Sequence, residues 1–281
     1  MVQNIVTTDY LASALQQDSQ SIRLFDATFH LIDKTRDAQQ ECGDEHISGA
    51  QFFDITRIAD TSSPLPNTVP SATTFEQSVR ALGVNSDHTV VAYDRYGLMS
   101  AARVWWLFRY FGHDNVVVLD GGLPKWLAER RPVDGDSVQY AQGNFTAELK
   151  PQLLSSVSQV HDIVNGNGPT IVDARGAGRF AGNSPEPREG LRAGHIPGSV
   201  NLPYSELLNS DHTFKRADEI TAAFKDAGVN PNEPIVASCG SGVTACILAL
   251  GLAQLGEQQT AVFDGSWTEW GSTQRLPIAT M

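Results

Sequence analysis

The sequence repeats its own motifs once, and the two copies are offset by roughly 145 to 150 residues within a chain of 281 residues. Four motifs recur in the same order: Asp26-Ala27 and Asp173-Ala174, His46-Ile47 and His195-Ile196, Val90-Val91-Ala92 and Ile235-Val236-Ala237, and Asp120-Gly121-Gly122 and Asp264-Gly265-Ser266. Solenoid units have periods of only about 20 to 50 residues. A single long period therefore predicts two homologous domains.

Each half of the sequence alternates short β-branched or apolar runs with segments of helical periodicity. The predicted strands are residues 89–93, 115–119, 170–172, 234–237 and 260–263, and the clearest predicted helices are residues 101–111 and 245–255. Such alternation is typical of a sheet whose parallel strands are joined by helices. We therefore predict the α/β fold class, with two tandem domains that are each a mainly parallel sheet flanked by helices.

Polar and small residues accumulate between the two halves, from about residue 133 to residue 153. This composition is typical of a connecting segment. We place the first domain at residues 1–140, the linker at residues 141–155 and the second domain at residues 156–281.

One cysteine begins a glycine-rich loop between a predicted strand and a predicted helix. The residues concerned are Cys239, Gly240, Ser241, Gly242, Val243 and Thr244. The glycines let the backbone curl so that consecutive N–H groups point at one sulfur, and the helix adds the positive end of its dipole. Because these surroundings stabilise a thiolate, we predict that Cys239 is a nucleophile held by this loop. The alternative is an inert buried cysteine beside an ordinary turn, and the pair of glycines favours the nucleophile.

The first half carries the matching loop without the cysteine. Aligning the repeats places Asp94 opposite Cys239, and Gly97 opposite Gly242. A carboxylate cannot act as a thiol nucleophile, so we predict that the first domain is noncatalytic. The simplest role for Asp94 is to cap the helix that follows it.

The run Cys-Gly-Ser-Gly-Val-Thr-Ala at residues 239–245 resembles the active-site loop of mercaptopyruvate sulfurtransferases, within the two-domain rhodanese family. Rhodaneses specific for thiosulfate differ by basic residues after the cysteine. The resemblance covers nearly the whole chain, with further matches at residues 26–27, 46–49, 52–55, 173–175, 194–198 and 264–270. It implies a sulfurtransferase that moves sulfane sulfur from 3-mercaptopyruvate, through a persulfide on Cys239, to a thiol or cyanide acceptor with release of pyruvate.

The same resemblance implies that Arg179 and Arg188 bind the donor, through its carboxylate and its keto oxygen. Arginine suits this task because its planar group binds a carboxylate through two hydrogen bonds and stays charged. Gly240 and Ser241 leave room for an α-keto acid. The alternative for Arg188 is a surface ion pair with Glu186 or Glu189.

The chain departs from the resembled family at one point. In that family the loop serine, here Ser241, works with a histidine and an acidic residue, but the matching positions hold Asn67 and Thr56. We therefore expect Ser241 to donate a hydrogen bond to a developing oxyanion without a proton relay of the family type. His46 and His195 each lie in a His-Ile-x-Gly turn, and we expect a neutral imidazole that is hydrogen-bonded to the backbone.

Composition narrows the range of partners. The net charge of −12 argues against nucleic acid, and no apolar run approaches the roughly 20 residues of a membrane span. The N-terminal residues lack the pattern of a signal peptide, so the predicted location is the cytoplasm.

The three cysteines, which include Cys42 and Cys246, suggest neither a disulfide framework nor a zinc site. We expect no cofactor and no metal. The expected partners are a small-molecule sulfur donor and a thiol acceptor such as a thioredoxin-like protein, or cyanide.

Other functions fit parts of the pattern. A cysteine phosphatase would need arginine at the position of Ala245, so its clamp for phosphate is missing. A thiosulfate:cyanide sulfurtransferase stays open as an alternative, as does a noncatalytic carrier of persulfide, which would hold sulfur without releasing pyruvate. Cys246 is expected to pack in the core, with a resolving thiol as the alternative.

Overall fold

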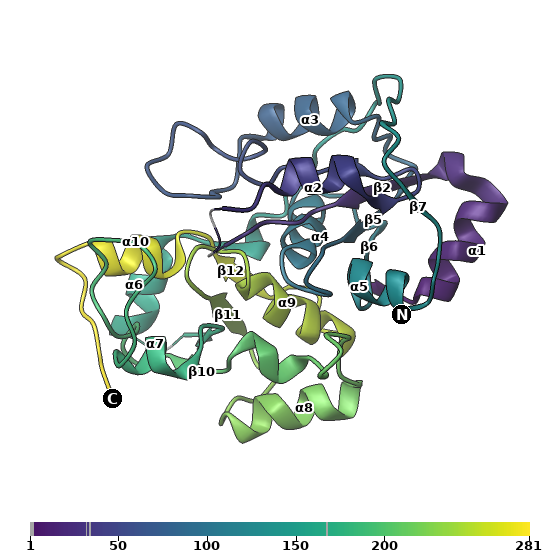
Figure 1. Ribbon diagram of the computed structural model, residues 1–281. Coiled ribbons are helices and arrows are strands. Elements are labelled where there is room, and N and C mark those ends of the chain that lie inside the picture. Colours follow the sequence, from purple (N-terminus) through teal and green to yellow (C-terminus); the bar gives the residue numbers. More distant parts are fainter. Residues whose placement is uncertain (1–2, 32, 34, 167) are drawn as a thin grey trace. The chain divides into compact units, whose positions relative to one another are not determined.

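The computed structural model describes residues 3–31, 33, 35–166 and 168–281, and Figure 1 shows its helices and strands. These residues form two compact units. The first takes in the chain up to Thr61 together with Val69–Lys150 and Ser210–Phe214. The second takes in Ser62–Thr68, Pro151–Asn209 and Lys215–Met281.

The first unit is built on a five-stranded parallel sheet with the order β1-β6-β5-β2-β4. Its strands are β1 (Ile5–Val6), β2 (Ile22–Asp26), β4 (Gln51–Phe52), β5 (Thr89–Tyr93) and β6 (Val116–Leu119). Its helices are α1 (Thr8–Asp18), α2 (Ala38–Asp44), α3 (Ala72–Ala81), α4 (Ala101–Tyr110) and α5 (Gly122–Ala128), with the short 3₁₀ helix η1 (Ser19–Ser21). A separate antiparallel pair joins β3 (His46–Ile47) to β7 (Val133–Asp134).

Both faces of this sheet are buried, which explains why its central strands are apolar almost throughout. On one face, Leu24 of β2 packs in a cluster with Leu11 of α1 and Trp126 of α5. The next residue of the strand points to the other face. There the ring of Phe25 lies 6.2 Å from the ring of Phe108 in α4.

The second unit is built on a five-stranded parallel sheet with the order β10-β9-β11-β12-β8. Its strands are β8 (Leu154–Ser155), β9 (Thr170–Asp173), β10 (Val200–Asn201), β11 (Ile235–Ser238) and β12 (Ala261–Phe263). Its helices are α6 (Val157–Asn165), α7 (Ala177–Ala181), α8 (Ala217–Asp226), α9 (Ala245–Gln254) and α10 (Ser266–Ser272), with the 3₁₀ helices η2 (Pro151–Leu153) and η3 (Tyr204–Leu207). Val160 of α6 and Trp267 of α10 share one apolar cluster with Val236 of β11, and α9 packs on β11 and β12.

The two sheets have the same topology. Read from the matching edge, β1-β6-β5-β2-β4 corresponds to β8-β12-β11-β9-β10. This equivalence confirms the predicted fold class, two α/β domains that each hold a parallel sheet with flanking helices. The strand expected at residues 89–93 is β5, and the helix expected at residues 101–111 is α4.

Residues at the end of the expected linker have regular structure. Residues 151–155, which the sequence assigned to the linker of 141–155, form η2 and β8, and β8 pairs with β12 at the edge of the second sheet. A strand of two residues is too short for an alternating pattern to reveal it.

Asp26, at the carboxyl end of β2, is fully buried. Its Oδ1 accepts hydrogen bonds from the N–H of Thr28, at 3.0 Å, and from the Thr28 hydroxyl, at 2.5 Å. The Arg95 Nε lies 3.7 Å from Oδ2. Burial raises the pKa of Asp26 to about 6, and the hydrogen bonds from Thr28 oppose this rise.

Replacing Asp26 with Asn should change how stability depends on pH. The pKa of Asp26 is raised in the folded state, so the native protein binds the Asp26 proton more tightly than the unfolded chain does. The wild-type free energy of unfolding therefore falls as the pH rises from about 4 to about 6. The introduced asparagine does not titrate, so the free energy of unfolding of Asp26→Asn, measured relative to the wild type, should be up to ~3 kcal/mol higher at pH 7 than at pH 4. Urea unfolding at both pH values measures this.

A matched control is Asp54→Asn, because Asp54 accepts from Thr56 in the same way, at 2.9 and 2.6 Å, but is more exposed. An equal pH-dependent gain in both variants would contradict the assignment to Asp26.

Candidate functional site

Cys239 follows β11, the central strand of the second sheet, and lies at the carboxyl end of that strand. Ligands of open α/β sheets bind at this end of the strands. The side chain is 1% exposed. Gly242 has a φ of +73°, a conformation that a residue with a side chain rarely adopts, and this turns the loop back before α9 begins.

Ser266 holds this loop from the first turn of α10. Its hydroxyl oxygen accepts hydrogen bonds from the N–H groups of Cys239, at 3.1 Å, and Gly242, at 3.2 Å. The hydroxyl donates to the Phe263 carbonyl at 2.7 Å, and its oxygen lies 3.9 Å from the Cys239 sulfur. Because the side chain is fully buried, it fixes the start of the loop without water.

Ser266 is not among the site residues predicted from the sequence, although the repeat contains a signal for it. The matching residue of the first domain is Gly122, where a Cβ would come 2.4 Å from the Asp94 carbonyl oxygen. Both positions have positive φ, +52° at Gly122 and +49° at Ser266. A serine in a conformation that favours glycine indicates that its hydroxyl is used.

The loop carbonyls are also bound, by α10. The Cys239 carbonyl accepts from the Trp267 N–H at 3.0 Å, and the Gly240 carbonyl accepts from the N–H and the hydroxyl of Thr268 at 2.9 and 2.6 Å. Within the described ranges, the N–H groups of Ser241 and Val243 have no hydrogen-bond acceptor. With its carbonyls engaged, the loop offers N–H groups to an anion.

The equivalent loop of the first domain binds a carboxyl group of its own. The Asp94 carboxylate accepts from the N–H groups of Tyr96 at 2.9 Å, Met99 at 2.7 Å and Ala101 at 2.9 Å. Burial raises the pKa of Asp94, while these backbone hydrogen bonds act in the opposite direction. Because Ala101 is the first residue of α4, the predicted capping role of Asp94 is confirmed.

Arg179 and Arg188 lie beside the two loop residues that follow the cysteine. A Cβ added to Gly240 would come 3.1 Å from Nη2 of Arg179, so the absence of a side chain there lets the guanidinium approach. The Arg188 Nη2 donates to the Ser241 hydroxyl oxygen at 3.4 Å. Burial lowers the pKa of Arg188, and the neighbouring charge of Arg179 adds to this effect.

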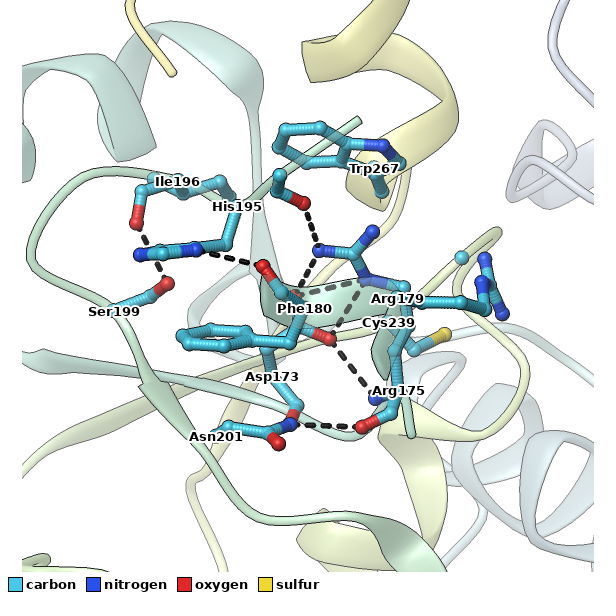
Figure 2. A network of polar contacts seen from close by, with 12 residues as sticks. Asp173, Arg175, Arg179, Phe180, His195, Ile196, Ser199, Asn201, Cys239 and Trp267 are labelled. Atoms are coloured by element: carbon cyan, nitrogen blue, oxygen red, sulfur yellow. Dashed lines mark hydrogen bonds and ion pairs between the residues drawn. The ribbon is translucent and has the colours of Figure 1, made fainter. Parts of the chain in front are cut away.

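Arg188 does not form the surface ion pair that was considered as its alternative role. Among the residues that the structure describes, no carboxylate pairs with Arg188, and Glu186 binds Arg175 and Arg179 instead. Figure 2 shows Arg175 with Asp173, and Arg179 and Cys239 lie in the same view.

The two histidines of the His-Ile-x-Gly turns bind the backbone. Nδ1 of His195 lies 2.8 Å from the Phe180 carbonyl oxygen, and its ring stacks on Phe180 at 3.9 Å (Figure 2). Nδ1 of His46 lies 2.7 Å from the Cys42 carbonyl oxygen. Both contacts agree with the predicted hydrogen bonds to the backbone, and Nε2 of His46 also lies 3.2 Å from Oδ1 of Asp134.

Three other candidates are each described by their own surroundings. Cys246 is fully buried, and its thiol donates to the Gly242 carbonyl at 3.2 Å, so it packs as predicted. Thr56 lies in the first unit, where its hydroxyl donates to Asp54 at 2.6 Å. Asn67 lies in the segment 62–68 of the second unit and is buried.

The described residues hold neither a metal-binding cluster nor a membrane-spanning helix. Neither a group of three or more His, Cys, Asp and Glu side chains that could hold a metal ion, nor a helix long and apolar enough to cross a membrane, occurs in that part of the chain.

Comparison with known proteins places this geometry in a family. The rhodanese-like domain family matches residues 8–129 and residues 156–273. The 3-mercaptopyruvate sulfurtransferase of Mus musculus is 42% identical over 270 residues, which cover 95% of this chain and 91% of the relative. The thiosulfate/3-mercaptopyruvate sulfurtransferase 2 of Arabidopsis thaliana is 41% identical over 295 aligned positions, covering 98% of this chain and 86% of the relative.

A solved structure agrees with the sequence relatives. The crystal structure of SseA from Escherichia coli, described as a 3-mercaptopyruvate sulfotransferase with the rhodanese fold, superposes with a TM-score of 0.86 at 38% identity, covering 94% of this chain and 99% of that chain. The match extends over both domains and includes the sheet that carries the Cys239 loop. The chain therefore belongs to the rhodanese family, as a two-domain sulfurtransferase.

Proposed function

We propose that this protein transfers sulfane sulfur from 3-mercaptopyruvate to an acceptor, with Cys239 as the sulfur carrier. The observation that carries the proposal is a buried cysteine whose loop offers N–H groups to an anion and lies beside two arginines. The names of the relatives, which include 3-mercaptopyruvate sulfurtransferase, support the choice of donor.

The first chemical step is a nucleophilic attack on sulfur. The Cys239 thiolate attacks the thiol sulfur of the donor, an S–S bond forms, and the C–S bond of the donor breaks. The electron pair of that bond stays on carbon as the enolate of pyruvate, which then takes up a proton. An acceptor thiolate or cyanide attacks the outer sulfur of the persulfide and restores Cys239.

The loop supplies the stabilisation that this step needs. The sulfur is anionic before the attack and again after the persulfide forms. We propose that the N–H groups of Ser241 and Val243, which have no acceptor among the described residues, stabilise this charge. Asp94 supports this reading, because the matching loop of the first domain binds a carboxylate with three N–H groups. We propose that Ser266 keeps the loop in this shape, since it binds the N–H groups of Cys239 and Gly242. The first domain, with Asp94 in place of the cysteine, then has no catalytic thiol.

The donor is held by Arg179 and Arg188 in this proposal. A guanidinium group binds a carboxylate through two parallel hydrogen bonds, and a second one can polarise the keto oxygen as the enolate forms. Gly240 leaves the space beside Arg179 free of a side chain. Thiosulfate is a second candidate donor, because a relative carries both donors in its name.

Proton transfer is proposed to proceed without a histidine relay. The Ser241 hydroxyl oxygen lies 3.4 Å from Nη2 of Arg188, and the hydroxyl can donate a hydrogen bond to the developing oxyanion. Asn67 and Thr56 hold no proton that they could exchange near neutral pH. A thioredoxin-like protein as the natural acceptor and a cytoplasmic location stay predictions.

Replacing Cys239 with Ser should abolish sulfur transfer and leave the fold intact, because a serine cannot form a persulfide and its alkoxide is inaccessible at neutral pH. Mass spectrometry of the wild type after incubation with donor alone should find one added sulfur on the peptide that holds Cys239. The control Cys246→Ser should keep both properties. Pyruvate release by Cys239→Ser above background, or sulfur on Cys42 or Cys246, would show that the nucleophile is misassigned.

Replacing Arg179 or Arg188 with Ala should weaken the use of mercaptopyruvate about 10- to 1000-fold in kcat/KM, because each change removes a charge-assisted hydrogen bond of roughly 1.5–3 kcal/mol or more. The rate at which a neutral alkylating agent modifies Cys239 should change little. Steady-state kinetics and alkylation rates measure the two effects separately. Unchanged mercaptopyruvate kinetics in both variants would return the arginines to a structural role.

The pH profile with mercaptopyruvate should show no ionisation step near pH 6.5, the reference value for imidazole, if no histidine gates the reaction. Introducing Asn67→His together with Thr56→Glu should raise turnover on mercaptopyruvate more than on thiosulfate, whose sulfite leaving group needs no proton. A histidine-like step in the wild type that disappears in His46→Gln or His195→Gln would contradict this proposal.

A further inference from the structure

A buried carboxylate, Glu186, lies between two arginines of the second domain. Its Oε1 accepts from Nη1 of Arg175 at 2.7 Å, and its Oε2 accepts from Nη2 of Arg179 at 2.5 Å and from Nε at 3.2 Å. The Glu186 side chain is 3% exposed, whereas that of Arg179 is 24% exposed. One side of the carboxylate is therefore inside the protein, and the other holds an arginine that reaches the surface.

Arg175 anchors Glu186. Its guanidinium binds both oxygens of Asp173, at distances of 2.7 to 3.1 Å, and donates to the Gly194 carbonyl at 2.9 Å. Its Cζ lies 4.4 Å from the ring centre of Trp267, and its side chain is 1% exposed (Figure 2). A group with this many fixed partners cannot move without breaking several of them, so it sets the position of Glu186.

Glu186 in turn sets the orientation of Arg179. It occupies Nε and one hydrogen of Nη2, which leaves the edge formed by Nη1 and the other Nη2 hydrogen. That edge is the one that can bind a carboxylate through two hydrogen bonds. Nη2 and Nη1 are also the Arg179 atoms closest to Gly240, at 3.1 and 3.8 Å from a Cβ placed there.

Glu186 also sets the charge of the site. Asp173 balances Arg175, and Glu186 balances Arg179. Arg188 has no ion pair among the described residues, so these three arginines and two carboxylates together carry one net positive charge. The Cys239 thiolate is left out of this count, because in the proposed function the loop N–H groups stabilise it. One positive charge matches the single carboxylate of an α-keto acid whose thiol is protonated, whereas thiosulfate carries two negative charges.

We infer that Glu186 is a positioning residue for Arg179 and a determinant of donor specificity, one that favours a monoanionic α-keto acid over a dianion. This inference rests on the proposed function and adds a residue through which the donor is chosen. Without the carboxylate the cluster carries two positive charges, which suits a dianion, and Arg179 loses the partner that orients it.

The test compares the donors in Glu186→Gln. The variant keeps the shape of the side chain but removes its charge. We expect kcat/KM for mercaptopyruvate to fall about 10- to 100-fold, while that for thiosulfate falls less or rises, so that the ratio of the two shifts at least about tenfold toward thiosulfate. Pyruvate release and thiocyanate formation measure the two reactions. The matched control is Glu189→Gln, which changes the net charge equally at an exposed side chain, and it should leave the ratio unchanged.

Two further variants distinguish the effect of Glu186 on the position of Arg179 from the effect of its charge. They also distinguish both effects from a simple loss of folding. Glu186→Asp keeps the charge but is shorter, so kcat/KM should fall for both donors while their ratio stays near the wild-type value. In the background of Arg179→Ala, Glu186→Gln should have little further effect on mercaptopyruvate, because its partner is already gone. These readouts do not depend on Glu186→Gln reaching wild-type stability.

The outcomes are distinct. An unchanged donor ratio in Glu186→Gln, a ratio in Glu186→Asp that shifts as far, or additive effects of Glu186→Gln and Arg179→Ala would each overturn the role of Glu186. Failure of the wild type to release pyruvate from mercaptopyruvate would overturn the proposed function, and the role of Glu186 with it.

Discussion

A loop of backbone N–H groups at the carboxyl end of the central strand is the feature that the two domains share. In the first domain the Asp94 side chain accepts from three N–H groups of its own loop. In the second domain Cys239 stands at the matching position. The Asp94 side chain therefore occupies the N–H groups of the first loop. In the proposed function, the N–H groups of the second loop stabilise the Cys239 thiolate and then its persulfide.

A second constraint is electrostatic. The chain carries a net charge of −12, so an anionic donor approaches a repulsive molecule and needs local positive charge. The arginines supply it, but a buried arginine needs a partner. Asp173 and Glu186 provide these partners, and among the described residues of this cluster only the Arg188 guanidinium, beside Ser241, lacks an ion pair. In the proposed function, stability and donor binding thus depend on the same carboxylates.

Much of the fold could be predicted from the sequence, because buried parallel strands and amphipathic helices leave strong local patterns. The repeat predicted two α/β domains, and β5, α4 and α9 lie within a residue of the predicted bounds. β8 was not predicted, because its two residues are too few to show a periodic pattern. Residues 62–68 belong to the second unit through contacts between distant parts of the chain, which no local sequence pattern predicts. The anion loop was predicted, whereas Ser266, 27 residues further along the chain, was not.

The sequence by itself determined the loop that begins at Cys239 and, through the repeat, the carboxylate that replaces the cysteine in the first domain. Both follow from which residue types stand between a strand and a helix, and this is local information. Only the tertiary structure decided which partners the charged groups take. Glu186 could have paired with Arg188, two residues away, yet it binds Arg175 and Arg179. The choice depends on which guanidinium groups the packing of β9 and α7 brings within hydrogen-bond distance, and that is a property of the folded chain.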